Sequence, residues 1–103
     1  MRQPLVAGNW KMNGSLASVR ELLAGLKKGV DEVKVAEVAV CPPSVFIPEA
    51  QTMLEGTAIS WGGQDISVHD VGAYTGETAG SMLTDFGCKY VIIGHSERRC
   101  YHG

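Results

Sequence analysis

Short apolar runs alternate along this chain with segments of helical periodicity, and this alternation limits the fold more than any other feature. Four runs have the length and composition of buried strands, so we expect strands at residues 5–8, 38–41, 58–61 and 90–93. Apolar residues between these runs recur at helical spacing, which predicts helices at about 16–28, 46–55 and 78–86 and the start of another near 96. This order is typical of βα units around a parallel sheet with right-handed crossovers.

Polar residues, prolines and glycines indicate where these elements begin and end. Ser18 and Glu21 have the spacing of a capping box in the first helix. Pro42-Pro43 ends the second strand, because proline cannot donate to a β ladder but suits the first turn of a helix. Gly62-Gly63 is expected to close the third strand. Periodicity alone leaves a choice between an open doubly wound sheet and half of an eight-stranded barrel.

Composition indicates one α/β domain over residues 1–103 and excludes several classes of partner. The chain has 103 residues, 45% of them hydrophobic, and a formal net charge of -2 with both signs scattered. Such a surface attracts neither nucleic acid nor an anionic membrane, so a small molecule is the favoured ligand. The cysteines at 41, 88 and 100 form no C-x-x-C pair, which indicates neither a disulfide framework nor a zinc site. We therefore expect a reducing cytoplasm, no metal, no targeting signal, and core roles for Cys41 and Cys88.

Chemically useful side chains follow the first and fourth strands. An extended chain would aim Asn9 and Lys11 to one side, where an amide and an ammonium could meet an anion. His95 stands where a strand leads into a helix that Ser96 could cap and Glu97 could stabilise, a place that favours neutral imidazole. Ligands of parallel α/β proteins bind at the carboxyl ends of strands. The alternatives are a solvated lysine and a structural histidine.

The connection from Gln64 to Gly76 is long and carries apolar side chains among glycines and acidic residues. Ile66, Val68 and Tyr74 are examples, and each needs a partner to bury it. Insertion into a second subunit and folding back on the chain's own scaffold are both consistent with this pattern.

Four motifs resemble the N-terminal part of the triosephosphate isomerase family in order and spacing. They are Gly8-Asn9-Trp10-Lys11-Met12-Asn13, Cys41-Pro42-Pro43, Gly72-Ala73-Tyr74-Thr75-Gly76-Glu77 and Val91-Ile92-Ile93-Gly94-His95-Ser96-Glu97-Arg98-Arg99. The resemblance covers the whole chain. It implies the N-terminal half of a (β/α)8 barrel with about four βα units, a homodimer, and no metal or organic cofactor. The implied reaction interconverts dihydroxyacetone phosphate and glyceraldehyde 3-phosphate in glycolysis and gluconeogenesis.

The resemblance also assigns roles within the site. It makes Asn9 and Lys11 substrate-binding residues, with Lys11 as the electrostatic anchor. It makes His95 the catalytic electrophile that polarises the substrate carbonyl and moves protons between its oxygens. Ser96 and Glu97 support that site.

The same resemblance places Gln64, Tyr74 and Thr75 in the dimer interface, with Thr75 against the neighbouring subunit's site. Gly63 and Asp65 stand where the family pattern suggests Ala and Asn, and Tyr74 stands where Phe is common. These departures affect details of the interface.

Length is the main departure from the family. A barrel of this type needs about 250 residues, whereas this chain stops inside its expected fourth helix. The glutamate base, the closing lid and the phosphate-binding amides belong to the second half, so we expect the fragment to be inactive alone. One alternative is a non-catalytic half-barrel that self-associates or pairs with another chain. Another is a phosphate-binding α/β domain of a different enzyme.

Overall fold

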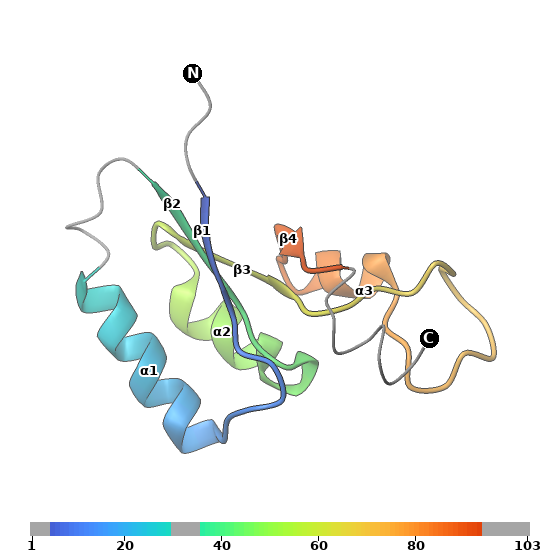
Figure 1. Ribbon diagram of the computed structural model, residues 1–103, viewed down its shortest axis with the longest axis horizontal. Coiled ribbons are helices and arrows are strands. Elements are labelled where there is room, and N and C mark those ends of the chain that lie inside the picture. Colours follow the sequence, from blue (N-terminus) through green and yellow to red (C-terminus); the bar gives the residue numbers. More distant parts are fainter. Residues whose placement is uncertain (1–4, 30–35, 94–103) are drawn as a thin grey trace.

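The computed structural model describes residues 5–29 and 36–93, and in these ranges strands and helices alternate as predicted (Figure 1). The strands are β1 (Leu5–Asn9), β2 (Glu37–Cys41), β3 (Ile59–Gly63) and β4 (Tyr90–Val91). The helices are α1 (Leu16–Gly29), α2 (Ile47–Leu54), which follows the short 3-10 turn η2 (Ser44–Phe46), and α3 (Gly80–Asp85). No helix in these ranges is long and apolar enough to cross a membrane.

All pairings in the described sheet are parallel, and the strand order β1-β2-β3-β4 follows the sequence. In a doubly wound sheet the order reverses at a switch point, whereas in a (β/α)8 barrel each strand lies beside its successor. The sequential order therefore removes the open doubly wound alternative. It agrees with the first half of a barrel, the architecture that the sequence resemblance implied.

The core lies between the sheet and the helices. α1 and α2 lie side by side on the same side of the sheet (Figure 1). Val40, Ile59 and Trp61 project from the strands toward them. The remaining buried members of this cluster come mainly from the helices: Val19, Leu23, Ile47, Ala50, Leu54 and Leu83. Because side chains alternate along a strand, neighbouring Ala39 and Ser60 face the opposite side, which is the interior in a barrel.

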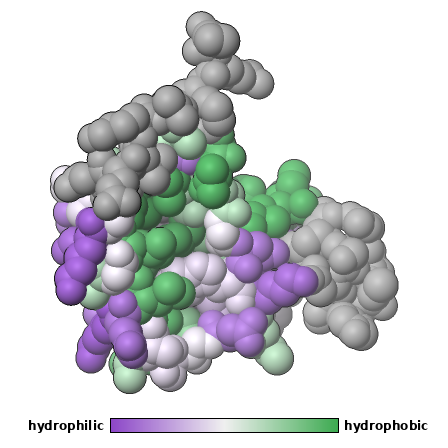
Figure 2. All heavy atoms as spheres, turned by 60° about the vertical axis from the view of Figure 1, so that its left-hand side comes forward, coloured by the Kyte–Doolittle hydropathy of each residue, from purple (hydrophilic) through white to green (hydrophobic). Residues whose placement is uncertain are grey.

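β1 is more exposed than its apolar sequence predicted. Leu5 is 46% exposed and Val6 59%, so the expectation of a strand buried on both faces is wrong for the described chain. The reason is position, because β1 pairs with β2 and forms an edge of the described sheet. Viewed with the α1 side brought forward, the molecule shows hydrophobic surface gathered in the middle of this face (Figure 2).

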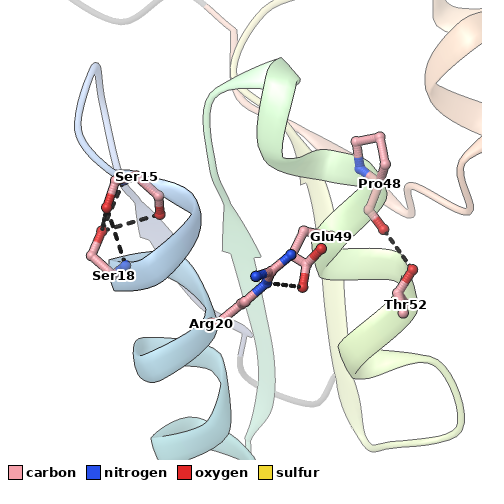
Figure 3. A network of polar contacts seen from close by, with 6 residues as sticks. All are labelled: Ser15, Ser18, Arg20, Pro48, Glu49 and Thr52. Carbon is pink, nitrogen blue, oxygen red and sulfur yellow. Dashed lines mark hydrogen bonds and ion pairs between the residues drawn. The ribbon is translucent and has the colours of Figure 1, made fainter.

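The N-terminus of α1 is capped one turn earlier than predicted (Figure 3). The Ser18 N–H donates to Ser15 Oγ over 3.2 Å, and the Ser15 N–H donates to Ser18 Oγ over 2.9 Å. This reciprocal pair acts as a capping box, so the predicted Ser18–Glu21 box is wrong. A cap must precede the first helical residue, and α1 begins at Leu16.

An exposed ion pair joins α1 to α2. Arg20 Nε lies 2.8 Å from Glu49 Oε1, and the side chains are 57% and 22% exposed (Figure 3). Surface pairs of this kind contribute about 0–1 kcal/mol. Apolar packing between the helices therefore matters more than this pair.

Gly62 and Gly63 are the last two residues of β3, so the strand ends at this pair as predicted but includes both glycines. Gly62 is in register with Tyr90 of β4, and a Cβ built on Gly62 would stand 2.1 Å from the Tyr90 carbonyl oxygen. Only glycine allows the two strands to approach this closely. β4 is shorter than predicted, although the Ile92 N–H continues the pairing by donating to the Gly63 carbonyl over 2.9 Å.

We expect Gly62→Ala in the full-length protein to lower the free energy of unfolding by at least about 1–3 kcal/mol, because the new methyl group forces β3 and β4 apart. Gly25→Ala in α1 is the matched control, since a Cβ there meets no atom within 4 Å. Alanine should leave α1 as stable or stabilise it by about 1 kcal/mol. Urea denaturation at fixed protein concentration measures both, and equal midpoints for the two variants would contradict the packing argument.

Candidate functional site

The backbone at the carboxyl end of β1 turns sharply at Lys11. Lys11 has a φ of 53° and is the only non-glycine with positive φ in the described ranges. A left-handed conformation costs a residue with a Cβ roughly 1–2 kcal/mol. The Asn9 side chain offsets part of this cost, because its Oδ1 accepts the Lys11 N–H over 2.9 Å. Strained backbone of this kind concentrates at functional sites.

The predicted direction of the triplet after β1 is partly confirmed. An extended chain would aim Trp10 to the side opposite Asn9 and Lys11, and Trp10 does pack against the core on the helix side of the sheet, away from the barrel interior. Lys11, however, is not extended, and the period-two argument does not place its side chain. The Asn13 side-chain amide donates to the Trp10 carbonyl over 2.9 Å and helps to hold the loop.

Gln64 links the carboxyl ends of the first three strands. It follows β3 directly, and its Nε2 donates to the Lys11 carbonyl over 2.8 Å and to the Cys41 carbonyl over 2.9 Å. Cys41 is the last residue of β2, and its carbonyl also accepts the Trp10 N–H over 3.2 Å. Both amide protons of Gln64 are therefore used, one on the Lys11 turn and the other on the end of β2.

This role of Gln64 was not predicted from the sequence. The family resemblance placed Gln64 only in a dimer interface, which stays a prediction. A signal was available, because Gln64 follows the third strand just as Lys11 follows the first, and carboxyl strand ends meet at one rim.

Cys41 and Cys88 have the surroundings of core residues. Cys41 is fully buried and Cys88 is half-buried, and burial raises the pKa of both thiols. The neighbouring Cys41 raises the pKa of the Cys88 thiol further. A thiol with a raised pKa stays protonated at neutral pH and is a poor nucleophile. This agrees with the interpretation from sequence.

A second polar cluster lies at the amino ends of the strands. Lys89 Nζ is 2.6 Å from Glu37 Oε1, at the start of β2. Hydrogen bonds from Lys89 and then Tyr90 lower the pKa of the Glu37 carboxyl, and the pairing with Glu37 raises the pKa of Lys89. Amino strand ends in barrels serve stability, so this cluster lies away from the candidate site. Within the described ranges no cluster of His, Cys, Asp or Glu could hold a metal ion.

The other residues predicted for the site and the dimer interface fall into two groups, those outside the described residues and those exposed on the surface. His95, Ser96 and Glu97 lie outside the described residues, so their place at the site stays a prediction. Tyr74 and Thr75 lie exposed in the long connection between β3 and α3 (Figure 1).

That connection buries only some of its apolar residues on its own scaffold. Ile66 packs against the core, but Val68 is 94% exposed and Val71 is 86% exposed. The alternative in which the whole loop folds back is therefore wrong for these two valines.

Comparisons with known proteins were consistent with one another. A sequence profile described as triosephosphate isomerase matches residues 4–103. The triosephosphate isomerase of Nitrosococcus oceani is 56% identical over 103 residues, covering 100% of this chain and 41% of the relative. That of Coxiella burnetii is 57% identical over 102 residues, covering 99% of this chain and 40% of the relative. A crystal structure of triosephosphate isomerase from Bartonella henselae superposes with a TM-score of 0.82 at 38% identity, covering 98% of this chain and 41% of that one. The chain thus spans about 40% of the length of these relatives.

We expect Gln64→Glu to loosen the Lys11 turn, because a carboxylate cannot donate to the Lys11 and Cys41 carbonyls and repels them. Loss of such donors costs roughly 1–3 kcal/mol. Hydrogen exchange of the Lys11 amide should speed up accordingly. Gln51→Glu on α2 is the matched charge control and should leave this amide unchanged. Equal exchange rates in the two variants would show that Gln64 does not hold the turn.

Proposed function

Because the chain belongs to the triosephosphate isomerase family, we propose that it forms the N-terminal part of an enzyme that interconverts dihydroxyacetone phosphate and glyceraldehyde 3-phosphate. The activity belongs to the full-length protein, of which these residues supply one part of the site. Glycolysis and gluconeogenesis are the corresponding pathways, and the cytoplasm is the corresponding compartment. No metal or organic cofactor is required for the proposed reaction.

The observation that carries the proposal is the fixed Lys11 turn. The Lys11 N–H donates to Asn9 Oδ1 over 2.9 Å, and the Lys11 carbonyl accepts a hydrogen bond from Gln64 Nε2 over 2.8 Å. A turn fixed from both sides needs little rearrangement when an anion arrives. An ammonium carried by such a fixed backbone can stabilise negative charge on a sugar oxygen or a phosphate. Lys11 is thus suited to anchor a phosphorylated triose, with Asn9 beside it.

The proposed chemistry divides between the two halves of the protein. A glutamate of the second half removes a proton from the carbon beside the substrate carbonyl. His95 donates a hydrogen bond to that carbonyl as negative charge develops on its oxygen, and then moves protons between the two oxygens. Ser96 and Glu97 hold His95 in place. Without the base no enediolate forms, so we propose that the 103-residue chain is inactive alone.

The exposed loop after β3 supports a homodimer in the full-length protein. Val68 and Val71 are almost fully exposed, and exposed apolar side chains on a projecting loop suit a protein partner. Tyr74 and Thr75 lie in the same loop. We place these residues and Gln64 at the interface with the second subunit.

A non-catalytic half-barrel is the second candidate. The exposed edge of β1, with Leu5 46% and Val6 59% exposed, favours it, since such an edge can pair with another chain. This candidate predicts a folded oligomer of the fragment and no isomerase activity in any longer form.

We expect the full-length protein to isomerise glyceraldehyde 3-phosphate and the 103-residue chain alone to show no turnover above background. A coupled assay that follows dihydroxyacetone phosphate measures both at equal subunit concentration. A full-length protein without activity would exclude the isomerase. Turnover by the short chain would show that the second half does not supply the base.

We expect Lys11→Met in the full-length enzyme to lower kcat/KM by about 10²–10³-fold, because methionine keeps the length of the side chain but removes its charge. Lys27→Met is the matched control. Lys27 lies in the last turn of α1, far along the chain from the strand end, and its loss should leave kcat/KM within about twofold. Steady-state kinetics in both directions measure the effect, and wild-type values for Lys11→Met would reject the anchor.

A further inference from the structure

The strand β4 depends on β3 for its place in the described sheet. It has two residues, Tyr90–Val91, and β3 is its only neighbour among the described strands. On either side of this pair, the Lys89 N–H donates to the Trp61 carbonyl over 2.9 Å and the Ile92 N–H donates to the Gly63 carbonyl over 2.9 Å. A strand this short makes few ladder hydrogen bonds, so the turn that leads into it has a large effect on its position.

The turn between α3 and β4 (Figure 1) lies against Trp61 of β3. The indole Nε1 donates to the Phe86 carbonyl over 2.6 Å, and Trp61 is 9% exposed. Phe86 follows the last residue of α3, where carbonyls have no partner within the helix, so the indole supplies one. Gly87 comes next with a φ of 76°, and a Cβ built on it would stand 2.8 Å from Trp61 Cζ2. Trp61 therefore holds the turn through its side chain at Phe86 and through its backbone at Lys89.

The position of β4 matters for the proposed reaction because this strand leads to His95. His95 comes three residues after Ile92 in the sequence, and three residues of chain reach at most about 11 Å. A displaced β4 therefore changes where His95 can act. A shift of about 1 Å in a catalytic group can lower a rate about 10²-fold.

We propose that Trp61 is a positioning residue for the isomerase reaction: by holding the turn at Phe86, it sets where β4 begins and thereby the place of His95. This inference rests on the proposed role of His95. It adds a residue that belongs to the core on the helix side of the sheet. Burial of the Trp61 ring stabilises the fold, whereas its hydrogen bond is directional and selects one position for the turn.

Trp61→Phe in the full-length enzyme removes the indole N–H and keeps a buried aromatic ring. We expect kcat to fall about 5- to 100-fold, because the displaced strand misplaces His95. KM should stay within about twofold, because Asn9 and Gln64 still hold the Lys11 turn. Hydrogen exchange of the Ile92 amide should speed up about 5- to 150-fold, the range expected when a carbonyl loses its donor.

Gly87→Ala tests the same turn from the other side, because its methyl group pushes the turn away from the Trp61 ring. Gly56→Ala is the matched control, since Gly56 also has a positive φ, 84°, but a Cβ there meets no atom within 4 Å. Both alanines should lower the midpoint of urea unfolding, because a left-handed residue with a Cβ is strained. Only Gly87→Ala should also lower kcat, by at least about fivefold.

The outcomes separate this inference from the proposed function. A lower kcat at unchanged KM in Trp61→Phe and Gly87→Ala, with wild-type kcat in Gly56→Ala, supports the positioning role. Wild-type kcat in both test variants overturns it and leaves the isomerase intact. An equal loss of kcat in Gly56→Ala also overturns it, because reduced stability then explains the effect.

Two further results bear on the route through β4. A lower kcat in Trp61→Phe without faster exchange of the Ile92 amide overturns that route. If Trp61→Phe does not fold, the comparison of Gly87→Ala with Gly56→Ala decides. A full-length wild-type protein without activity overturns the isomerase and this inference together.

Discussion

The parallel register of the sheet is the constraint on which the site depends. It brings the carboxyl ends of β1, β2 and β3 to one rim, and there the Gln64 amide donates to the carbonyls of Lys11 and Cys41. Gln64 follows β3, and neither carbonyl belongs to that strand, so one side chain links the ends of three elements. The left-handed Lys11 turn persists because these contacts and the Asn9 side chain hold it.

Sequence patterns predicted the elements well because each pattern is local. Apolar runs and helical spacing placed four strands and three helices within a few residues of their observed bounds. The exposure of β1 could not be read locally, since burial depends on which strand lies beside it. The close approach of Tyr90 to Gly62 was not predicted for the same reason: a glycine that only ends a strand and one that admits a close neighbour look alike in sequence.

The roles of Asn9 and Lys11 stay predictions, made from their position at a strand end and from likeness to a family, and the geometry of the turn around them was not predicted. His95, Ser96 and Glu97 lie outside the described residues. The positive φ of Lys11 follows from hydrogen bonds with partners as distant in sequence as Gln64. No local propensity encodes such a contact, although the strand-end position of Gln64 could have indicated it.

The exposed edge of β1 has a consequence for biosynthesis. Of the described strands β1 is made first, and on its outer side its peptide groups and the side chains of Leu5 and Val6 have no neighbouring strand within the described residues. If the full-length protein closes into a barrel of about 250 residues, the closing strand leaves the ribosome roughly ten to fifty seconds later. During that interval the nascent chain exposes the unpaired, apolar edge of β1, and such an edge is a typical binding site for a chaperone.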